Sequence, residues 1–174
     1  IGQSDQDVFS TYAQRQKNIS ISGFFMDDTE ITNNEYRQFV EWVRDSTAHE
    51  LMGNKETDPY DNETIDWTID LDYDDETLAE MYYEGDMAFE GRRELNYAGL
   101  KYKYQWIDWQ KAAHDKTATR KSIINKAEVK IYPDTLCWIR DFTYAYNEPQ
   151  TRNYFWHPAF DDYPVVGVNW KQAT

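Results

Sequence analysis

The chain has 174 residues, with 32 acidic and 18 basic side chains, a formal net charge of -14 and an aromatic fraction of 17%. Chains of low hydropathy and high net charge often cannot bury enough apolar surface to fold, but 7 Trp, 14 Tyr and 8 Phe supply the material of a core. The length suits one ordinary domain. The negative charge disfavours nucleic acid as a partner. The sequence contains no run of about 18 apolar residues, so no membrane-spanning helix is predicted.

The first elements expected along the chain are a strand over 18–26, where isoleucines alternate with serines, and a helix that begins after Thr32. Thr32 and Glu35 have the spacing of a capping box, in which the hydroxyl accepts from a first-turn amide and the carboxylate accepts from the cap amide. Gly53 predicts the end of this helix. Four apolar side chains follow the spacing of one buried helix face: Tyr36, Phe39, Val40 and Val43.

Most of the negative charge lies in one segment. Residues 54–90 contain 14 acids and a single lysine, whereas 1–53 and 91–174 carry net charges of -5 and +4. The simplest interpretation is an acidic insertion, 54–94, between an N-terminal part of a domain and its continuation, 95–174. Because like charges repel, we expect this insertion to be solvated or to lie against a basic surface.

Within the insertion, Asp70, Asp72 and Asp74 alternate as the ligands of a calcium loop do. The spacing fails the EF-hand pattern, because Asp75 takes the place of the required Gly and Met81 that of the bidentate Glu. A solvated acidic face is therefore the main interpretation, with calcium binding at the three aspartates as the alternative. The same stretch predicts a strand, since four apolar side chains alternate with polar ones: Trp67, Ile69, Leu71 and Tyr73.

The stretch 97–113 is rich in rings, and its periodicity is ambiguous between a strand and a helix, although the spacing of Trp106, Trp109 and Ala113 favours a helix. The stretch 116–126 that follows carries four bases and no acid. Single-stranded nucleic acid is disfavoured there, because the rings precede the bases instead of alternating with them. We expect the bases to meet a complementary partner surface or the acidic insertion of this chain itself. These residues of the insertion and the basic stretch are expected to take part in assembly: Asp66, Asp70, Asp72, Lys116, Arg120 and Lys121.

The last third of the chain predicts strands over 128–133 and 135–142, and a long loop over 147–162. The sole cysteine, Cys137, excludes an intrachain disulfide and is expected to pack as a small hydrophobe. A short strand with Pro164 at its edge then precedes a helix that Asn169 caps and Trp170 begins. Because the chain stops in the first turn of that helix, we expect it to be the front part of a larger domain.

The residues alone indicate no active site. The three histidines share no metal-ligand spacing, and no strand-turn-helix motif presents a nucleophilic serine. The seven glycines do not cluster into a phosphate-binding loop. The segment 1–7 lacks a basic start, so any signal or lipid anchor is expected to lie outside this chain.

Two stretches resemble the hallmarks of the formylglycine-generating-enzyme (sulfatase-modifying-factor) domain. FFMDDTEITNNEYRQFVEWVRD, residues 24–45, resembles the strand-to-helix opening of that family, and YPVVGVNWKQA, residues 163–173, resembles its second hallmark, a strand before a helix. The resemblance implies an α+β, formylglycine-generating-enzyme-like (C-type-lectin-like) fold, incomplete here and interrupted by the acidic insertion. The motif residues are Thr32, Glu35, Tyr36, Phe39, Pro164 and Trp170.

Three longer stretches, 31–46, 132–149 and 154–170, are most similar to the gliding-motility lipoproteins of the Bacteroidetes, the GldK/PorK branch with GldJ as a near relative. This resemblance implies a non-catalytic structural subunit of the periplasmic ring of the type IX secretion and gliding-motility machinery. Such a subunit assembles with itself and with a GldN/PorN-like protein. It is attached to the outer membrane only through a lipid anchor, which would lie outside this chain.

The resemblance leaves two alternative functions open. A catalytic member of the superfamily oxidises a substrate cysteine with two copper-binding cysteines, which lie in a C-terminal half that this chain is not expected to reach. Cys137 precedes the second hallmark and corresponds to neither. No cofactor is expected in this chain, and calcium would belong to the missing part of the domain. The other alternative is a carbohydrate- or peptide-binding module that uses the ring-rich loop 144–160.

Overall fold

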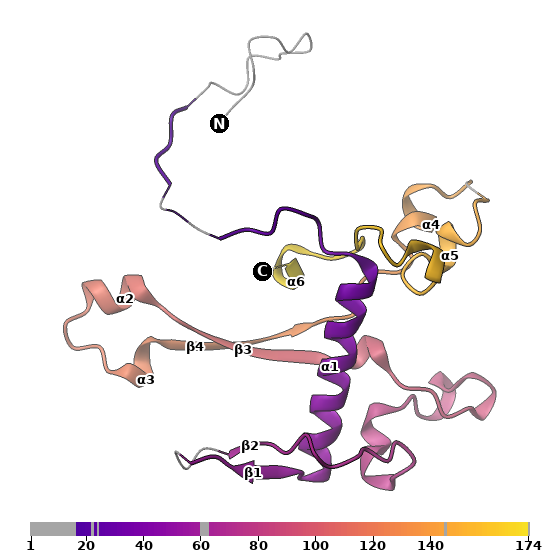
Figure 1. Cartoon of the computed structure of the whole chain (residues 1–174), viewed down its shortest axis with the longest axis horizontal. Coiled ribbons are helices and arrows are strands. Elements are labelled where there is room, and N and C mark those ends of the chain that lie inside the picture. Colours follow the sequence, from indigo (N-terminus) through magenta and orange to yellow (C-terminus); the bar gives the residue numbers. More distant parts are fainter. Residues whose placement is uncertain (1–16, 22, 24, 60–62, 145, 174) are drawn as a thin grey trace. The chain divides into compact units, whose positions relative to one another are not determined.

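The second of two compact units carries all the regular structure that can be described. The computed structural model describes residues 17–21, 23, 25–59, 63–144 and 146–173. The first unit is Ile1–Glu30, and its described residues form neither helix nor strand, so the strand expected over 18–26 is wrong there; residues 22 and 24 lie outside the described part. The second unit, Ile31–Thr174, combines helices and strands and belongs to the α+β class (Figure 1).

Helix α1 (Asn33–Met52) is confirmed with both of its predicted ends. The hydroxyl of Thr32 accepts from the Glu35 amide at 3.2 Å, and the Glu35 carboxylate accepts from the Thr32 amide at 2.9 Å. Gly53 ends the helix with a φ of 73°, a left-handed conformation that favours glycine. The helix therefore has its boundaries set by local chemistry alone.

The arm, residues 101–130, is an antiparallel hairpin that carries two short helices at its tip (Figure 1). Strands β3 (Lys101–Ile107) and β4 (Ile124–Lys130) pair from Lys101↔Lys130 to Ile107↔Ile124, and the tip holds α2 (Trp109–His114) and α3 (Arg120–Ile123). The helix expected over 97–113 is thus wrong for its first part. The rings there alternate with polar residues at a period of two, and pairing with β4 fixes them as a strand.

The acidic segment, residues 54–94, forms turns where the strand over 67–73 was expected, so that prediction is wrong. Three aspartates turn the chain by accepting from the backbone amide two residues ahead, which competes with strand pairing. They are Asp66 with Thr68, Asp72 with Asp74, and Asp75 with Thr77. The described elements are an antiparallel hairpin of β1 (Lys55–Thr57) and β2 (Glu63–Ile65), then the 3-10 helices η1 (Glu76–Met81), η2 (Gly85–Met87) and η3 (Phe89–Gly91).

The C-terminal segment is mostly helical turns. The strand expected over 135–142 is wrong, because Asp134 accepts from the Leu136 amide at 3.1 Å and opens a helical turn there. The short strand expected after Pro164 is reduced to an isolated bridge, whereas the cap of Asn169 on the last helix is confirmed. Its elements are α4 (Cys137–Asp141), α5 (Gln150–Asn153), η5 (Pro158–Phe160) and α6 (Trp170–Ala173), whereas η4 (Tyr97–Gly99) lies between the acidic segment and the arm.

The core gathers on the predicted face of α1. Leu78 and Met81 reach it from η1, so the acidic segment is anchored by apolar burial while most of its described acidic residues are exposed. The Tyr36 hydroxyl donates to the carbonyl of Ile131 at 2.7 Å. Its burial raises its pKa to about 12. The buried residues of the cluster are Tyr36, Val40, Val43, Ala48, Leu78, Met81, Leu100, Ile131 and Phe155, with Phe39 partly buried against them.

Leu78→Ala tests whether the acidic segment belongs to the core. Leu78 is fully buried, so its truncation is expected to lower the free energy of unfolding by about 2–5 kcal/mol. The matched control is Ile69→Ala, in the same segment but exposed, which is expected to change it by less than about 0.5 kcal/mol. Urea unfolding measures both. An equal, small effect of the two variants would contradict the anchoring.

Candidate functional site

The two motif segments meet at the start of α1. Pro164 forms an antiparallel bridge with Thr32, the Val165 amide donates to the Ile31 carbonyl at 2.9 Å, and the Asn33 amide donates to the Tyr163 carbonyl at 2.8 Å. These hydrogen bonds join segments about 130 residues apart in the sequence. Of the six motif residues, the structure pairs Thr32 with Pro164. Glu35, Tyr36 and Phe39 follow on α1, and Trp170, in α6, is 78% exposed.

An ion pair strengthens this junction. Arg37 of α1 pairs with the carboxylate of Asp161 and also donates to the Phe155 carbonyl at 2.8 Å. The amide side chain of Asn33 donates to the Phe160 carbonyl at 2.8 Å. Backbone carbonyls of the loop are thus satisfied by side chains of α1, which fixes the loop on the helix.

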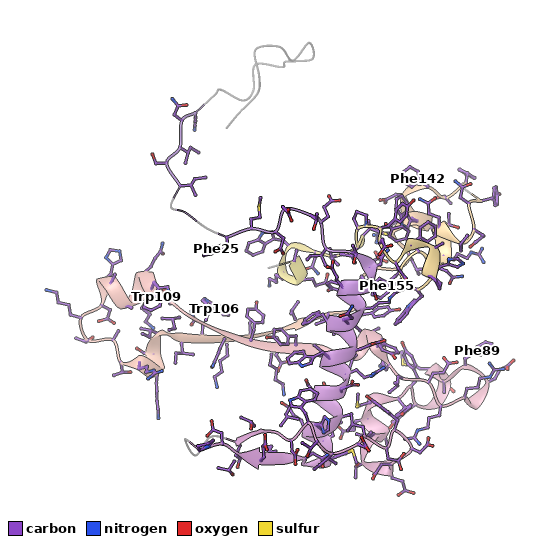
Figure 2. All side chains as sticks on the ribbon, in the orientation of Figure 1. Phe25, Phe89, Trp106, Trp109, Phe142 and Phe155 are labelled. Atoms are coloured by element: carbon purple, nitrogen blue, oxygen red, sulfur yellow. The ribbon has the colours of Figure 1, made fainter. Side chains whose placement is uncertain are left out.

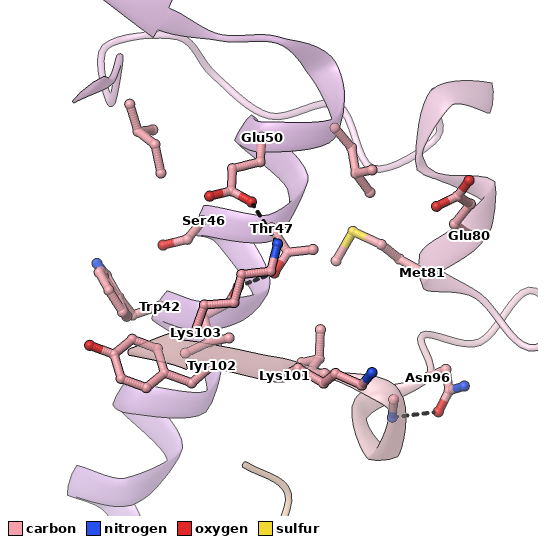
Figure 3. Close-up of a pocket in the computed structure, with 15 residues that line it drawn as sticks. Trp42, Ser46, Thr47, Glu50, Glu80, Met81, Asn96, Lys101, Tyr102 and Lys103 are labelled. Atoms are coloured by element: carbon pink, nitrogen blue, oxygen red, sulfur yellow. Dashed lines mark hydrogen bonds and ion pairs between the residues drawn. The ribbon is translucent and has the colours of Figure 1, made fainter. Parts of the chain in front are cut away.

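A groove of about 560 Å³ runs between α1, β3 and η1 (Figure 3). Its walls include Trp42 from α1, Tyr102 from β3 and Met81 from η1. Two charged side chains also line it: the ammonium of Lys103 lies 4.0 Å from the carboxylate of Glu50. Inside it, the Ser46 hydroxyl is buried without a hydrogen-bond partner among the described residues. The groove suits an apolar ligand group that carries one hydrogen-bonding atom. In such a site the apolar walls bury the ligand, and a few polar side chains fix its orientation. No sequence pattern indicates this groove, because its lining comes from α1, from β2 and η1 of the acidic segment, and from the stretch 96–103.

The arm carries a ladder of rings that starts at α1 (Figure 2). Tyr102 contacts Phe39 edge to face, with ring centroids 5.5 Å apart. Tyr104 stacks on Tyr102 at 6.4 Å, and Trp106 stacks on Tyr104 at 5.5 Å. The inner end of the ladder is covered by α1, whereas Trp106 is 46% and Trp109 72% exposed.

The predicted basic residues lie at the tip of the arm. Lys116 is in the turn after α2, while Arg120 and Lys121 begin α3, and all three are exposed. Within the described part of the chain, none of the three forms an ion pair. The structure thus places the predicted bases beside the exposed end of the ring ladder, which sequence spacing did not indicate.

The predicted aspartates are spread over turns of the acidic segment. The carboxylates of Asp66 and Asp72 each accept a hydrogen bond from a backbone amide two residues ahead. The carboxylate of Asp74 lies 3.5 Å from the guanidinium of Arg93. Asp70 is exposed and has no such contact in the described residues. No group of three metal-ligating side chains is arranged to hold a metal among the residues that the structure describes, and calcium binding at Asp70, Asp72 and Asp74 stays a prediction.

A second anchor of the acidic segment went unrecognised in the sequence. Tyr73 donates to the carboxylate of Asp45, and the guanidinium of Arg44 lies over the Tyr73 ring, 5.2 Å from its centroid. Arg44 also donates to Asp45 at 2.6 Å and to the Tyr97 hydroxyl at 3.4 Å. This partly buried cluster links α1 to both the acidic segment and η4.

Cys137, the thiol of the chain, lies half-buried in α4. Burial and the nearby carboxylate of Asp134 raise its pKa, so the neutral thiol predominates at physiological pH. A thiol in this state is a poor nucleophile, in keeping with its expected packing role.

Membrane and homology searches add no identification. None of the described helices is long and apolar enough to cross a membrane. Comparison of the chain with protein-family models, with curated proteins and with solved structures gives no match.

Thr32→Ala is expected to raise the pKa of Glu35 toward its ordinary value of 4.5. The hydrogen bonds from the Thr32 amide and hydroxyl lower that pKa, and the variant removes the hydroxyl. A carboxylate whose pKa is lowered by folding stabilises the folded state at pH values above its pKa in the unfolded chain. This stabilisation is lost as the pH falls through its pKa in the folded state. The loss of unfolding free energy relative to wild type is thus expected to be largest at neutral pH and smaller in acid.

Carboxyl NMR titration and urea unfolding measure the two effects. The control is Thr47→Ala, whose hydroxyl donates to the Val43 carbonyl within α1 and does not reach Glu35. A Glu35 pKa that is identical in wild type and Thr32→Ala would contradict the capping box.

Proposed function

We propose that this chain is a non-catalytic structural subunit of the periplasmic ring of the type IX secretion and gliding-motility machinery, built on a formylglycine-generating-enzyme-like fold. Two lines support the fold. The stretches 24–45 and 163–173 carry the two hallmarks, and their residues Thr32 and Pro164 pair as neighbours in one unit. A strand segment paired beside the start of a capped helix agrees with the order of the hallmarks.

The observation that carries the assembly role is the extent of exposed apolar surface. Large apolar side chains stand in solvent on several elements, and Figure 2 marks some of them. Exposed apolar side chains that lie near one another, as Trp106 and Trp109 do on the arm, are typical of protein-binding surfaces, because their burial against a partner is favourable. Those of the second unit with the greatest exposure include Met87, Phe89, Trp109, Tyr144, Tyr146 and Trp170.

The same surfaces bear on the alternative of a sugar- or peptide-binding loop. In the loop 144–160, Tyr154 and Phe155 are buried in the core, and Trp156 donates to the Tyr132 hydroxyl at 2.7 Å. Tyr144 and Tyr146 are exposed. Two of the loop's six aromatic side chains are therefore buried and a third is tied by a hydrogen bond within the chain, which favours the structural role over a sugar platform.

The proposed partners are further copies of the chain and a GldN/PorN-like protein, and the proposed location is the periplasmic face of the outer membrane. A lipid anchor outside this chain would hold it there. No residue of the chain is assigned a catalytic or cofactor role.

Co-purification of the full-length natural protein with a GldN/PorN-like protein tests the proposal. We expect a stable large complex on size-exclusion chromatography and closed rings in electron micrographs. A parallel assay with a sulfatase-derived cysteine peptide and copper is expected to give no aldehyde product. A protein that stays monomeric and ignores the partner, or that oxidises the peptide, would overturn the proposal.

A further inference from the structure

We infer that the outer half of the arm, residues 105–126, is a docking element that binds the acidic segment of a second copy of this chain. The inference rests on the proposed function in one respect, since it takes the chain to be a self-assembling subunit. It adds the two surfaces that meet and the head-to-tail manner in which they do so.

The first step is the uneven cover of the arm. Its inner end packs on α1 through Tyr102, whose ring also lies 6.1 Å from that of Trp42. Beyond Tyr104 the ladder has no cover among the described residues, and Trp106, Ile107 and Trp109 are all exposed. A two-stranded hairpin is marginally stable alone in water, so an exposed ring face on one is expected to gain from a partner.

The second step is the order of the tip. Asp108 caps α2 by accepting from the Lys111 amide at 2.9 Å, and its own amide donates to the Ile123 carbonyl at 2.8 Å. The ammonium of Lys111 donates to the Ser122 carbonyl at 2.9 Å and joins α2 to α3. A tip held by its own hydrogen bonds is preorganised, and less conformational entropy is lost when it binds.

The third step is charge. The arm carries eight bases and three acids, and its outer bases have no ion pair within the described residues. The acidic segment carries 15 acids and three bases, among them carboxylates that accept no hydrogen bond and form no ion pair there: Asp70, Glu76 and Glu84. Opposite net charges of this size steer two surfaces together and set which ones meet.

The fourth step is that both surfaces expose apolar side chains as well as charged ones. The acidic segment also exposes Trp67, Met87 and Phe89, the last two 77% and 61% exposed. Each surface thus offers rings to bury and charges to pair. Within one chain, no ion pair joins the arm to the acidic segment among the described residues, which leaves both free for a neighbour.

An arm that binds a different patch on the next copy makes a heterologous contact. Such contacts repeat from copy to copy and form a ring when the rotation closes. One pair of surfaces per junction would therefore suffice for the assembly that the proposed function requires.

Charge reversal in trans tests the inference on the full chain, with self-association measured by sedimentation velocity. The arm variant is K116E/R120E/K121E, and the segment variant is D70K/E76K/E84K. Each alone is expected to weaken self-association by about tenfold or more, because like charges then face each other. An equal mixture is expected to restore association, since each reversed surface meets its complement on the other variant.

The matched control for the arm variant is R140E/R152E/K171E, which changes the net charge equally but alters exposed bases outside the arm. It is expected to associate more strongly than the arm variant. Circular dichroism and thermal melting verify that every variant is folded as the wild type is.

Three results would overturn the inference. One is wild-type self-association that the arm variant and the control weaken equally, which would leave the proposed function standing. Another is a mixture that fails to associate although each variant is folded, as a contact within one chain would give. The third is a wild type that is monomeric at every concentration; binding to the GldN/PorN-like protein then decides separately whether the proposed function survives.

Discussion

Burial of one face of α1 is the constraint on which the rest of the structure depends. Tyr36, Val40 and Val43 form that face, and each apolar side chain removed from water contributes about 1.5–3 kcal/mol. The arm, the acidic segment and the C-terminal segment each supply residues that pack on it. The helix is therefore the element that all three segments share.

This constraint explains how a strongly acidic segment is retained in a folded domain. Repulsion among its carboxylates favours an extended, solvated chain. Leu78 and Met81 oppose that tendency by their burial against α1, and the cluster of Tyr73, Asp45 and Arg44 adds a second attachment. The charge that dominates the composition is therefore displayed from an anchored support, which suits it to electrostatic recognition.

Sequence reasoning predicted α1 well because its signals are local. The capping box at Thr32 and Glu35, the apolar spacing and Gly53 act within a few residues of one another. The arm could not be predicted in the same way. Trp106 and Trp109 have the spacing of a helix. The strand β3 forms because its residues pair with β4, which for Trp106 lies about twenty residues further on in the sequence.

The candidate surfaces show the same division between local and distant signals. The bases of the tip were recognised as a patch, since charge is visible in sequence. Their position beside the exposed end of the ring ladder depends on the fold of the hairpin and could not be read from spacing. The groove at Ser46 depends on three segments that meet only in space, so no sequence pattern indicates it.

Native-state hydrogen exchange of backbone amides tests most directly whether α1 organises one cooperative unit. The amides to compare are those of Val43 in α1, Leu78, which donates to the Asp75 carbonyl, and Ile131, which donates to the Leu100 carbonyl. If the account is right, all three exchange with about the same opening free energy, that of global unfolding. If Leu78 exchanges as fast as an unprotected loop while Val43 stays protected, the acidic segment does not share the core and the account is wrong.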